Sequence, residues 1–182
     1  MDNPWIVKKK EIVHETPWIK VASHDVIDPN GNPGAYSTVH FKKVAVGIIP
    51  LDEDYNTWIV GQYRFPTDAY SWEIVEGGAE RAEDPLECAK RELSEEAGVA
   101  AEKWQHILSF EMSNAATDER AEIYIAKGLS FHNAHPDPDE QLQVKKLPFN
   151  ELFEMVMKGE LIDSMTVAGV LKAKLLMDQG LI

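Results

Sequence analysis

The fold is decided by one stretch, Gly77-Gly78-Ala79-Glu80-Arg81-Ala82-Glu83-Asp84-Pro85-Leu86-Glu87-Cys88-Ala89-Lys90-Arg91-Glu92-Leu93-Ser94-Glu95-Glu96-Ala97-Gly98-Val99. The paired glycines predict a turn where the stretch begins. Asp84 followed by Pro85 predicts a helix N-terminus, because a capping carboxylate and a proline at the first helical position are both favoured there. Gly98 suits the left-handed residue that follows a helix. We therefore expect a glycine loop that leads into a helix over residues 85–97.

One side of this predicted helix is apolar and its border is acidic. At 100° per residue, the apolar stripe consists of Leu86, Ala89, Leu93 and Ala97. Glu92 and Glu96 are four residues apart and stack on one edge of that stripe, with Glu95 beside them. Carboxylates this close repel one another, and a divalent cation that takes their oxygens as ligands removes the repulsion. Acidic helix faces are also commonly just solvated, so the helix alone leaves both interpretations open.

Length and composition limit the class of protein. The chain has 182 residues, which suits one domain or one domain with a small appendage. A formal net charge of −13 argues against a nucleic-acid partner, since phosphate backbones are bound by clustered Lys and Arg. We find no apolar run of membrane-spanning length and no signal pattern at the N-terminus, so we expect a cytoplasmic protein without a membrane partner. Cys88 is the single cysteine, and its helical context favours a packed small residue over a nucleophile.

The first 41 residues predict a small antiparallel β meander. The turn-forming stretch 28–34 separates β-rich segments, and the predicted strands are 8–13, 18–27 and 36–41. Such a sheet buries little by itself, so it must pack on the rest of the chain or on a second copy. Trp5 and Trp18 are candidates for that burial, in the core or in an interface, and stacking on a ligand base is the alternative.

The remaining residues, 42–182, predict a second unit with helices among hairpin strands. The expected strands are 43–51, 57–63, 71–75, 104–112, 121–127 and 142–147. Helices are expected over 150–158, with Asn150 as the N-cap, and over 164–178. This order favours a mixed α/β sandwich over a doubly wound parallel sheet.

The central stretch resembles the box of the Nudix hydrolases. Its order is G, five residues, E, seven residues, then R-E-L-x-E-E-x-G-V, and the matching positions are Gly77, Glu83, Arg91, Glu92, Leu93, Glu95, Glu96, Gly98 and Val99. The order of the predicted strands is also similar to the Nudix α/β/α sandwich. The resemblance implies hydrolysis of a nucleoside diphosphate that is linked to a further group.

The resemblance also implies a metal centre. Its cofactor would be Mg²⁺, with Mn²⁺ as a substitute, and its ligands would be Glu92, Glu96, Glu95, Glu83 and the backbone carbonyl of Glu76. Arg91 would orient Glu83 or Glu95. Such metals bridge pyrophosphate oxygens and lower the pKa of a bound water.

Outside the box, Gln62-Tyr63-Arg64 and the run from Glu73 to Gly78 resemble the ADP-ribose and nucleotide-sugar pyrophosphatases. In that subgroup an N-terminal meander builds a homodimer whose site is shared between subunits. Arg64 would then hold a phosphate or the terminal ribose, and Glu73 and Gly78 would contact the substrate. Arg120 is a weaker candidate for a phosphate or sugar. A plain surface arginine is the alternative for Arg64.

The general base in this subgroup usually lies on a loop after the box, and Glu140 fits that place, with Asp137 and Asp139 as fallbacks. These acids could instead only solvate the loop. ADP-ribose enzymes often carry a proline where this chain reads Ser113-Asn114-Ala115-Ala116-Thr117, so we expect a broader range that includes ADP-ribose, GDP-mannose and ADP-sugars. The alternatives are a dinucleotide or nucleoside triphosphate pyrophosphatase, and a non-catalytic nucleotide-sugar sensor.

Overall fold

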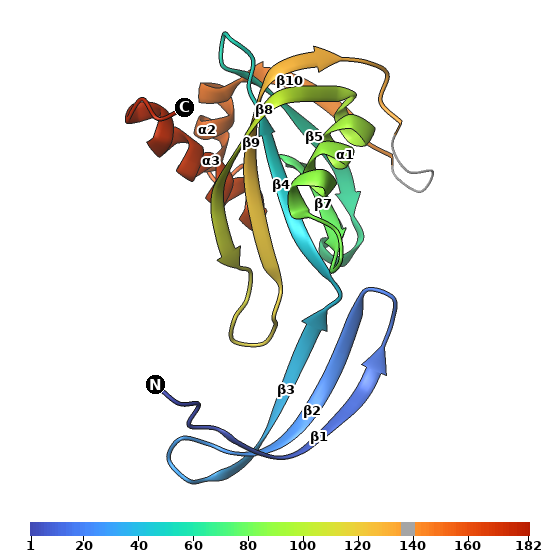
Figure 1. The fold of residues 1–182 in the computed structure, drawn as a ribbon, viewed down its shortest axis with the longest axis vertical. Helices are drawn as coiled ribbons and strands as arrows, with labels where there is room; N and C mark the ends of the chain where they lie inside the picture. The colour runs from blue at the N-terminus through green and yellow to red at the C-terminus, as the bar shows by residue number, and fades with distance from the viewer. Residues whose placement is uncertain (136–140) are drawn as a thin grey trace.

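The computed structural model describes residues 1–135 and 141–182, and it shows an extended three-stranded sheet attached to a larger α/β body (Figure 1). The extended sheet is antiparallel in the order β1 (Ile6–Glu15), β2 (Ile19–Ile27) and β3 (Pro33–Phe41). The turn before β3 is held by the Asp28 carboxylate, which accepts hydrogen bonds from the amides of Asn30 at 2.8 Å and Asn32 at 2.9 Å. Gly31 adopts a φ of +88°, a conformation that favours glycine. The predicted meander and its turn are confirmed.

Two further sheets form the body. The four-stranded sheet has the order β7 (Val75–Glu80), β4 (Lys43–Pro50), β9 (Arg120–Phe131) and β8 (Val99–Glu111). Within it, β4 and β9 are parallel, whereas β7 and β8 pair antiparallel with their neighbours. The second sheet is antiparallel, in the order β10 (Gln143–Pro148), β5 (Asn56–Arg64) and β6 (Ala69–Glu73), with the short 3₁₀ turn η1 (Phe65–Thr67) between β5 and β6.

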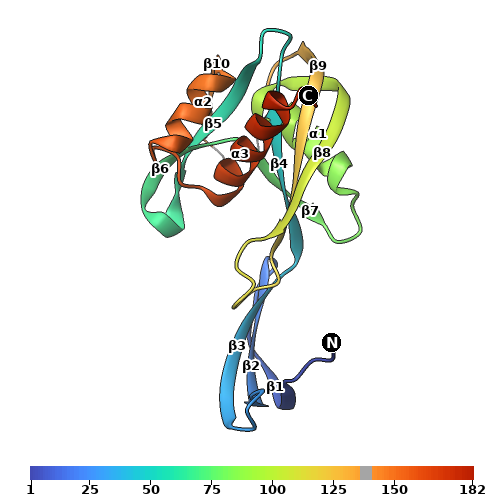
Figure 2. The same ribbon diagram turned by 90° about the vertical axis from the view of Figure 1, so that its left-hand side faces the viewer.

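Helices cover both faces of the four-stranded sheet (Figure 2). Helix α1 (Pro85–Ala97) lies on one face, and α2 (Phe149–Met157) and α3 (Ser164–Asp178) lie on the other. The consecutive residues Ile48 and Ile49 point to opposite faces, so they pack in the α1-side and α3-side cores respectively. A strand buried on both faces needs this nearly continuous apolar run. The predicted α/β/α sandwich is confirmed.

The predicted glycine turn is wrong. Gly77 and Gly78 lie inside β7 and pair with Val46 and Ala45 of β4. The strand expected over 71–75 is instead interrupted at Ile74, where the chain leaves one sheet and enters the other. Glycine indicates a turn only when the backbone must bend, whereas here it permits close approach of another group, which is described below.

Two other expectations also differ from the structure. Helix α2 begins at Phe149 with Pro148 before it and shows no side-chain cap, so Asn150 is not the N-cap; burial of Phe149 places the first turn earlier. Strand β8 begins at Val99, directly after the helix, rather than near residue 104. Trp5 and Trp18 are 39% and 67% exposed, so they do not pack in the core of this chain, and their burial in an interface stays a prediction.

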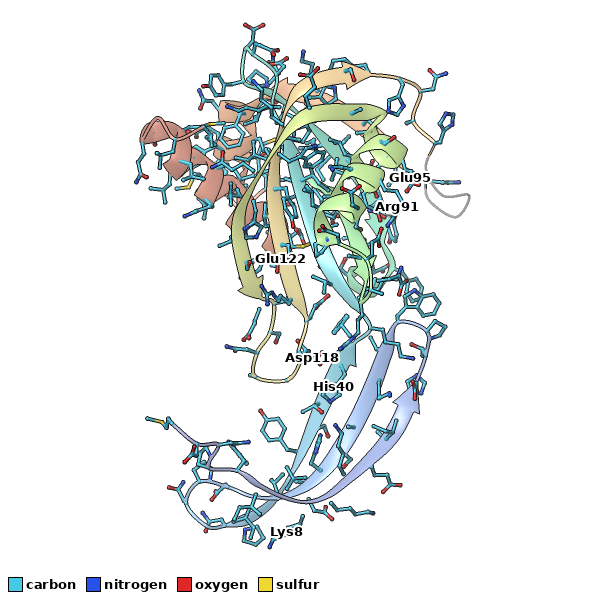
Figure 3. The ribbon with its side chains drawn as sticks, viewed as in Figure 1. Lys8, His40, Arg91, Glu95, Asp118 and Glu122 are labelled. Atoms are coloured by element: carbon cyan, nitrogen blue, oxygen red, sulfur yellow. The ribbon has the colours of Figure 1, made fainter. Side chains whose placement is uncertain are left out.

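Contacts with the loop between β8 and β9 tie the meander to the body. The His40 ring lies 2.8 Å from the Asp118 carboxylate, and both side chains are labelled in Figure 3. Asp118 also accepts a hydrogen bond from the Phe41 amide at 2.9 Å. The amide of Val39 donates to the Ala116 carbonyl at 2.9 Å. The meander is thus anchored at its β3 end, while every residue of β1 is exposed. The domain boundary between residues 41 and 42 stays a prediction.

Candidate active site

Helix α1 is built as the sequence predicts. Asp84 caps its N-terminus by accepting a hydrogen bond from the Leu86 amide at 2.9 Å, and Gly98 ends it with a φ of +63°. Ala89 and Leu93 are fully buried against the sheet. Helix α1 also contacts strand β7. Glu96, at the edge of the apolar face of α1, is itself buried, with 3% exposure.

The carboxylate of Glu92 lies directly over Gly77. A Cβ built on Gly77 would stand 2.2 Å from the Cγ and Cδ atoms of Glu92, far inside a van der Waals contact. Strand β7 is an edge strand of its sheet, so Glu92 reaches across the helix–strand junction to that edge. The first glycine of the central stretch is needed because it leaves room for a carboxylate.

Arg91 gathers three carboxylates of the stretch. Its guanidinium lies 2.9 Å from Glu92, 3.0 Å from Glu95 and 3.5 Å from Glu83, and Figure 3 labels Arg91 and Glu95 together on α1. Burial alone would lower the pKa of Arg91, but Glu92 and the hydrogen bond to Glu95 raise it above its ordinary value. The structure thus brings together four of the predicted site residues, and Arg91 balances the repulsion among the acids.

Cys88 lies next to Arg91 and Glu92, but its thiol is unreactive. Burial, and then the nearby Glu92 carboxylate, raise the pKa of its thiol to about 12. The thiol is therefore protonated at neutral pH, and a thiolate is required for nucleophilic attack. The structure agrees with the expectation of a packed small residue, since Cys88 is fully buried.

A second arginine, Arg64, binds two acids, Glu73 just before β7 and Glu76 within it. Arg64, at the end of β5, donates to both carboxylate oxygens of Glu73, with Nε at 3.0 Å from each and Nη2 also in contact. Its Nη2 lies 3.6 Å from the Glu76 carboxylate. Burial alone would lower the pKa of Arg64, but its bonds to Glu73 raise it. Arg64 and Glu73, both predicted to contact substrate, therefore bind each other.

The side chain of Glu76 is an addition that the sequence did not reveal, because only its backbone carbonyl was expected at the site. It is 7% exposed and accepts a hydrogen bond from the Thr166 hydroxyl at 3.3 Å. Burial, and then a hydrogen bond with the Asp163 carboxyl, raise the pKa of Glu76 well above its usual range. Asp163 caps α3 by accepting from the Thr166 amide at 2.8 Å. The sequence signal that could have drawn attention to this part of the site was Asp163, an acid just before the predicted helix over 164–178.

A cleft of about 1030 Å³ opens beside these residues. Its cations are Lys43 and Arg64, and the rest of its lining includes Glu73, Glu76, Gly77, Gly78, Glu119, Glu160, Asp163 and the aromatic rings of Trp18, Phe41, Tyr70 and Trp72. Rings, cations and hydrogen-bonding groups in one concave site suit a ligand with both a base or sugar and phosphates. Gly78, Arg64 and Glu73 thus lie together at the cleft, and their contact with substrate stays a prediction.

Other predicted residues lie elsewhere. The structure places Arg120 on the α1-side face of β9, where its Nε pairs with Glu122 at 2.7 Å, and Figure 3 labels Glu122 beside β8 and β9. Alternation along the strand puts Arg120 on the same face as Glu122 and Tyr124, and Tyr124 packs in the α1-side core. The cleft lies on the α3 side, so the described residues do not bring Arg120 to it. Glu140, Asp137 and Asp139 lie outside the described residues.

The donor set fits a hard divalent cation in its chemistry. Carboxylate oxygens are the ligands that Mg²⁺ and Mn²⁺ prefer, and Gly77 provides a cradle that a Cβ would fill. Among the residues that the structure describes, no three acidic, histidine or cysteine side chains gather closely enough to hold a metal as they stand. Arg91 pairs with Glu83, Glu92 and Glu95, so a cation would compete with its guanidinium for those carboxylate oxygens.

This architecture is an α/β/α sandwich in which strand β7 both packs against the acidic helix α1 and lines the cleft. The model of the NUDIX domain matches residues 41–164, more than half of the chain, so the chain belongs to the Nudix family and is a Nudix hydrolase. Members of the family generally use divalent metal ions.

Three relatives illustrate the range of names among similar proteins. The chain is 34% identical to a methanol dehydrogenase activator of Bacillus methanolicus over 84% of this chain and 83% of the relative. It is 28% identical to an ADP-ribose pyrophosphatase of Bacillus subtilis over 88% of each. It is 26% identical to a CMP-5'-(N-acetyl-N-hydroxy-3-aminopropyl)phosphonate hydrolase of Streptomyces rubellomurinus over 92% of this chain and 81% of the relative.

The fold is also that of a solved structure described as an ADP compounds hydrolase. The TM-score is 0.86 with 22% identity, over 98% of this chain and 97% of the other. The match includes the meander as well as the body, since nearly the whole chain is covered. In the described part of the chain, the helices are too short or too polar to cross a membrane.

Proposed function

We propose that the chain is a Mg²⁺-dependent pyrophosphatase of nucleoside diphosphate sugars, including ADP-ribose, GDP-mannose and ADP-sugars. Water would attack one phosphorus, the P–O–P bond would break, and the products would be a nucleoside monophosphate and a sugar phosphate. The observation that carries this proposal is the Glu92 carboxylate packed over Gly77, because Gly77 itself lines the cleft that holds Arg64. A relative named ADP-ribose pyrophosphatase supports the substrate class.

The proposed metal ligands are Glu92, Glu96, Glu95, Glu83 and the carbonyl of Glu76. A divalent cation bound there would neutralise charge on the pyrophosphate oxygens. Glu73 binds Nε and Nη2 of Arg64, and Arg64 also lines the cleft. Arg64 would bind a phosphate or the terminal ribose, and Gly78 would let the backbone approach the substrate. Arg120 stays a weaker proposal, since its ion pair with Glu122 must open first.

Proton abstraction from the attacking water is proposed for Glu140, with Asp137 and Asp139 as fallbacks. General bases contribute about 10²- to 10⁴-fold, so Glu140→Ala should lower kcat by at least about 10²-fold. Asp137→Ala and Asp139→Ala serve as comparison variants. If one of these lowers kcat more than Glu140→Ala does, the base is the residue with the larger effect.

We also propose a cytoplasmic homodimer formed through the meander. Support comes from the number of exposed apolar side chains on and beside β1: Trp5, Ile6, Val7, Ile12, Val13 and Trp18. Exposed apolar area of this kind commonly marks an interaction site. Light scattering coupled to size exclusion should report twice the mass of one chain, and a monomer at micromolar concentration would contradict a site shared between subunits.

The decisive experiment is a panel of ADP-ribose, GDP-mannose, ADP-glucose, dinucleotides and nucleoside triphosphates, assayed for release of monophosphates with Mg²⁺ and with EDTA. Nucleotide sugars should be turned over only with metal. Glu96→Gln should remove most activity without unfolding the protein. Glu87→Gln is a matched control on α1, because Glu87 is exposed and pairs with Lys90 away from the border. Hydrolysis of triphosphates alone would refute the proposed substrate class.

A further inference from the structure

The chain changes sheets inside the candidate active site. Glu73 pairs with Val60 in the three-stranded sheet, and two residues later Val75 pairs with Ile48 in the four-stranded sheet. Ile74 lies between the two ladders and is buried. A buried backbone N–H must find a partner outside the ladders, because leaving it unsatisfied is costly.

A single side chain of α3 supplies that partner. The Ile74 amide donates to the hydroxyl of Thr166 at 3.0 Å, and the same hydroxyl donates to the Glu76 carboxylate at 3.3 Å. Thr166 is fully buried, and its own amide is fixed by the Asp163 carboxylate. One hydroxyl therefore holds both the crossing between the sheets and an acid of the cleft.

We propose that Thr166 is a positioning residue for the active site. The crossing that it anchors begins at Glu73, which binds Arg64, and ends at Glu76, which adjoins Gly77 beneath Glu92. Displacement of this segment would move the Arg64 guanidinium and the Glu76 carbonyl together. The inference rests on the proposed function, since it assigns Thr166 an effect on that same site. A displacement of about 1 Å near reacting groups can cost about 10²-fold in rate.

The test uses threonine-to-valine changes at two buried positions. Thr166→Val keeps the shape and removes both hydrogen bonds, and Thr166→Ser restores the hydroxyl. Thr57→Val is the matched control, because Thr57 is also fully buried and its hydroxyl has no hydrogen-bond partner among residues 1–135 and 141–182. With ADP-ribose, Thr166→Val should lower kcat/KM by about tenfold or more, as expected for a misplaced site. Thr166→Ser and Thr57→Val should stay within about threefold, a change of less than 1 kcal/mol in the barrier.

Two readouts separate positioning from general stability. The Mn²⁺ affinity, measured by calorimetry, should fall in Thr166→Val and recover in Thr166→Ser. Hydrogen exchange of the Ile74 amide, followed by NMR, should accelerate in Thr166→Val and stay unchanged in Thr57→Val. If Thr166→Val does not fold, Thr166→Ala is measured in the same way.

Wild-type kcat/KM and Mn²⁺ affinity in a folded Thr166→Val would overturn the inference. Equal losses in Thr57→Val would also overturn it, because the effect would then follow from any change in the core. If the wild type hydrolyses no nucleotide sugar, the proposed function fails, whereas Mn²⁺ affinity and Ile74 exchange still decide whether Thr166 anchors this segment.

Discussion

Replacement of Gly77 by alanine is the most direct test of how the site is built. The new Cβ would stand 2.2 Å from the Glu92 side chain. Carbon atoms settle about 3.5 Å apart or more, so the Glu92 carboxyl group must move by roughly 1.3 Å. If Glu92 binds the catalytic metal as proposed, a shift of that size should cost about 10²-fold, which is about 2.7 kcal/mol of transition-state stabilisation.

The backbone itself should accept this change. Gly77 is not among the glycines with positive φ, so alanine meets no left-handed strain there. We therefore expect a folded protein whose kcat/KM for ADP-ribose falls by about 10²-fold and whose Mg²⁺ requirement rises. The assay is steady-state release of AMP across a Mg²⁺ titration, with thermal unfolding followed in parallel.

The neighbouring glycine supplies the comparison. A Cβ on Gly78 would meet Lys43, with its Cδ at 2.9 Å, and that flexible side chain can move away. Gly78→Ala should therefore leave the Mg²⁺ requirement unchanged, since its Cβ does not meet Glu92, and any loss of kcat/KM would report contact with the substrate. If the Mg²⁺ requirement rises equally in the two variants, or if Gly77→Ala is fully active, the contact between Gly77 and Glu92 does not control the site.

Three further predictions concern charge and reactivity. Burial opposes ionisation of Asp118, but the hydrogen bond with His40 lowers the pKa of Asp118 below 3.8. The ionised carboxylate therefore stabilises the contact between the meander and the body above pH 3.8, and this stabilisation is lost as the pH falls through the folded-state pKa. Asp118→Asn should accordingly lower the melting temperature at pH 5 more than at pH 3. Arg64→Lys replaces the two-pronged bond to Glu73 with a single point charge, so kcat/KM for ADP-ribose should fall by about tenfold or more, as hydrogen bonds to charged groups are worth about 1.5–3 kcal/mol. Because the pKa of Cys88 is raised to about 12, a thiol reagent at pH 8 should react with the unfolded protein but only slowly with the native one; rapid native labelling would contradict the buried, protonated thiol.

The elements with strong local signals were predictable from the sequence. Asp84, Pro85 and Gly98 define α1 by capping chemistry, which acts within one helical turn, and the structure has the same bounds. The meander was likewise predictable from its turn and its alternating strands. The turn at Gly77 and Gly78 was not, because the reason for those glycines is the side chain of Glu92, fifteen residues away in the sequence and adjacent in space. Local sequence rules do not see such a contact.

The site divides in the same way. Arg91, Glu92 and Glu95 lie on one helix, so their spacing indicates that they belong together. The pairing of Arg64 with Glu73 depends on the register between β5 and β6, and the bonds of Thr166 depend on how α3 packs. Local sequence does not determine packing or register between distant elements. Arg64 and Glu73 were therefore predicted as site residues without their ion pair, and Thr166 was not predicted.

Two arginines partly neutralise the clustered carboxylates of the candidate site. Arg91 holds Glu83, Glu92 and Glu95 on the helix side of β7, and Arg64 holds Glu73 and Glu76 on the side of the cleft. Each acid group is thus partly neutralised by a cation from its own side, with the glycine strand between them. Under the proposed function, a divalent cation would compete with Arg91 for carboxylate oxygens, whereas a substrate phosphate would meet the exposed part of Arg64. Metal and substrate would then each engage a different arginine, so that one acidic site could receive both a cation and an anion.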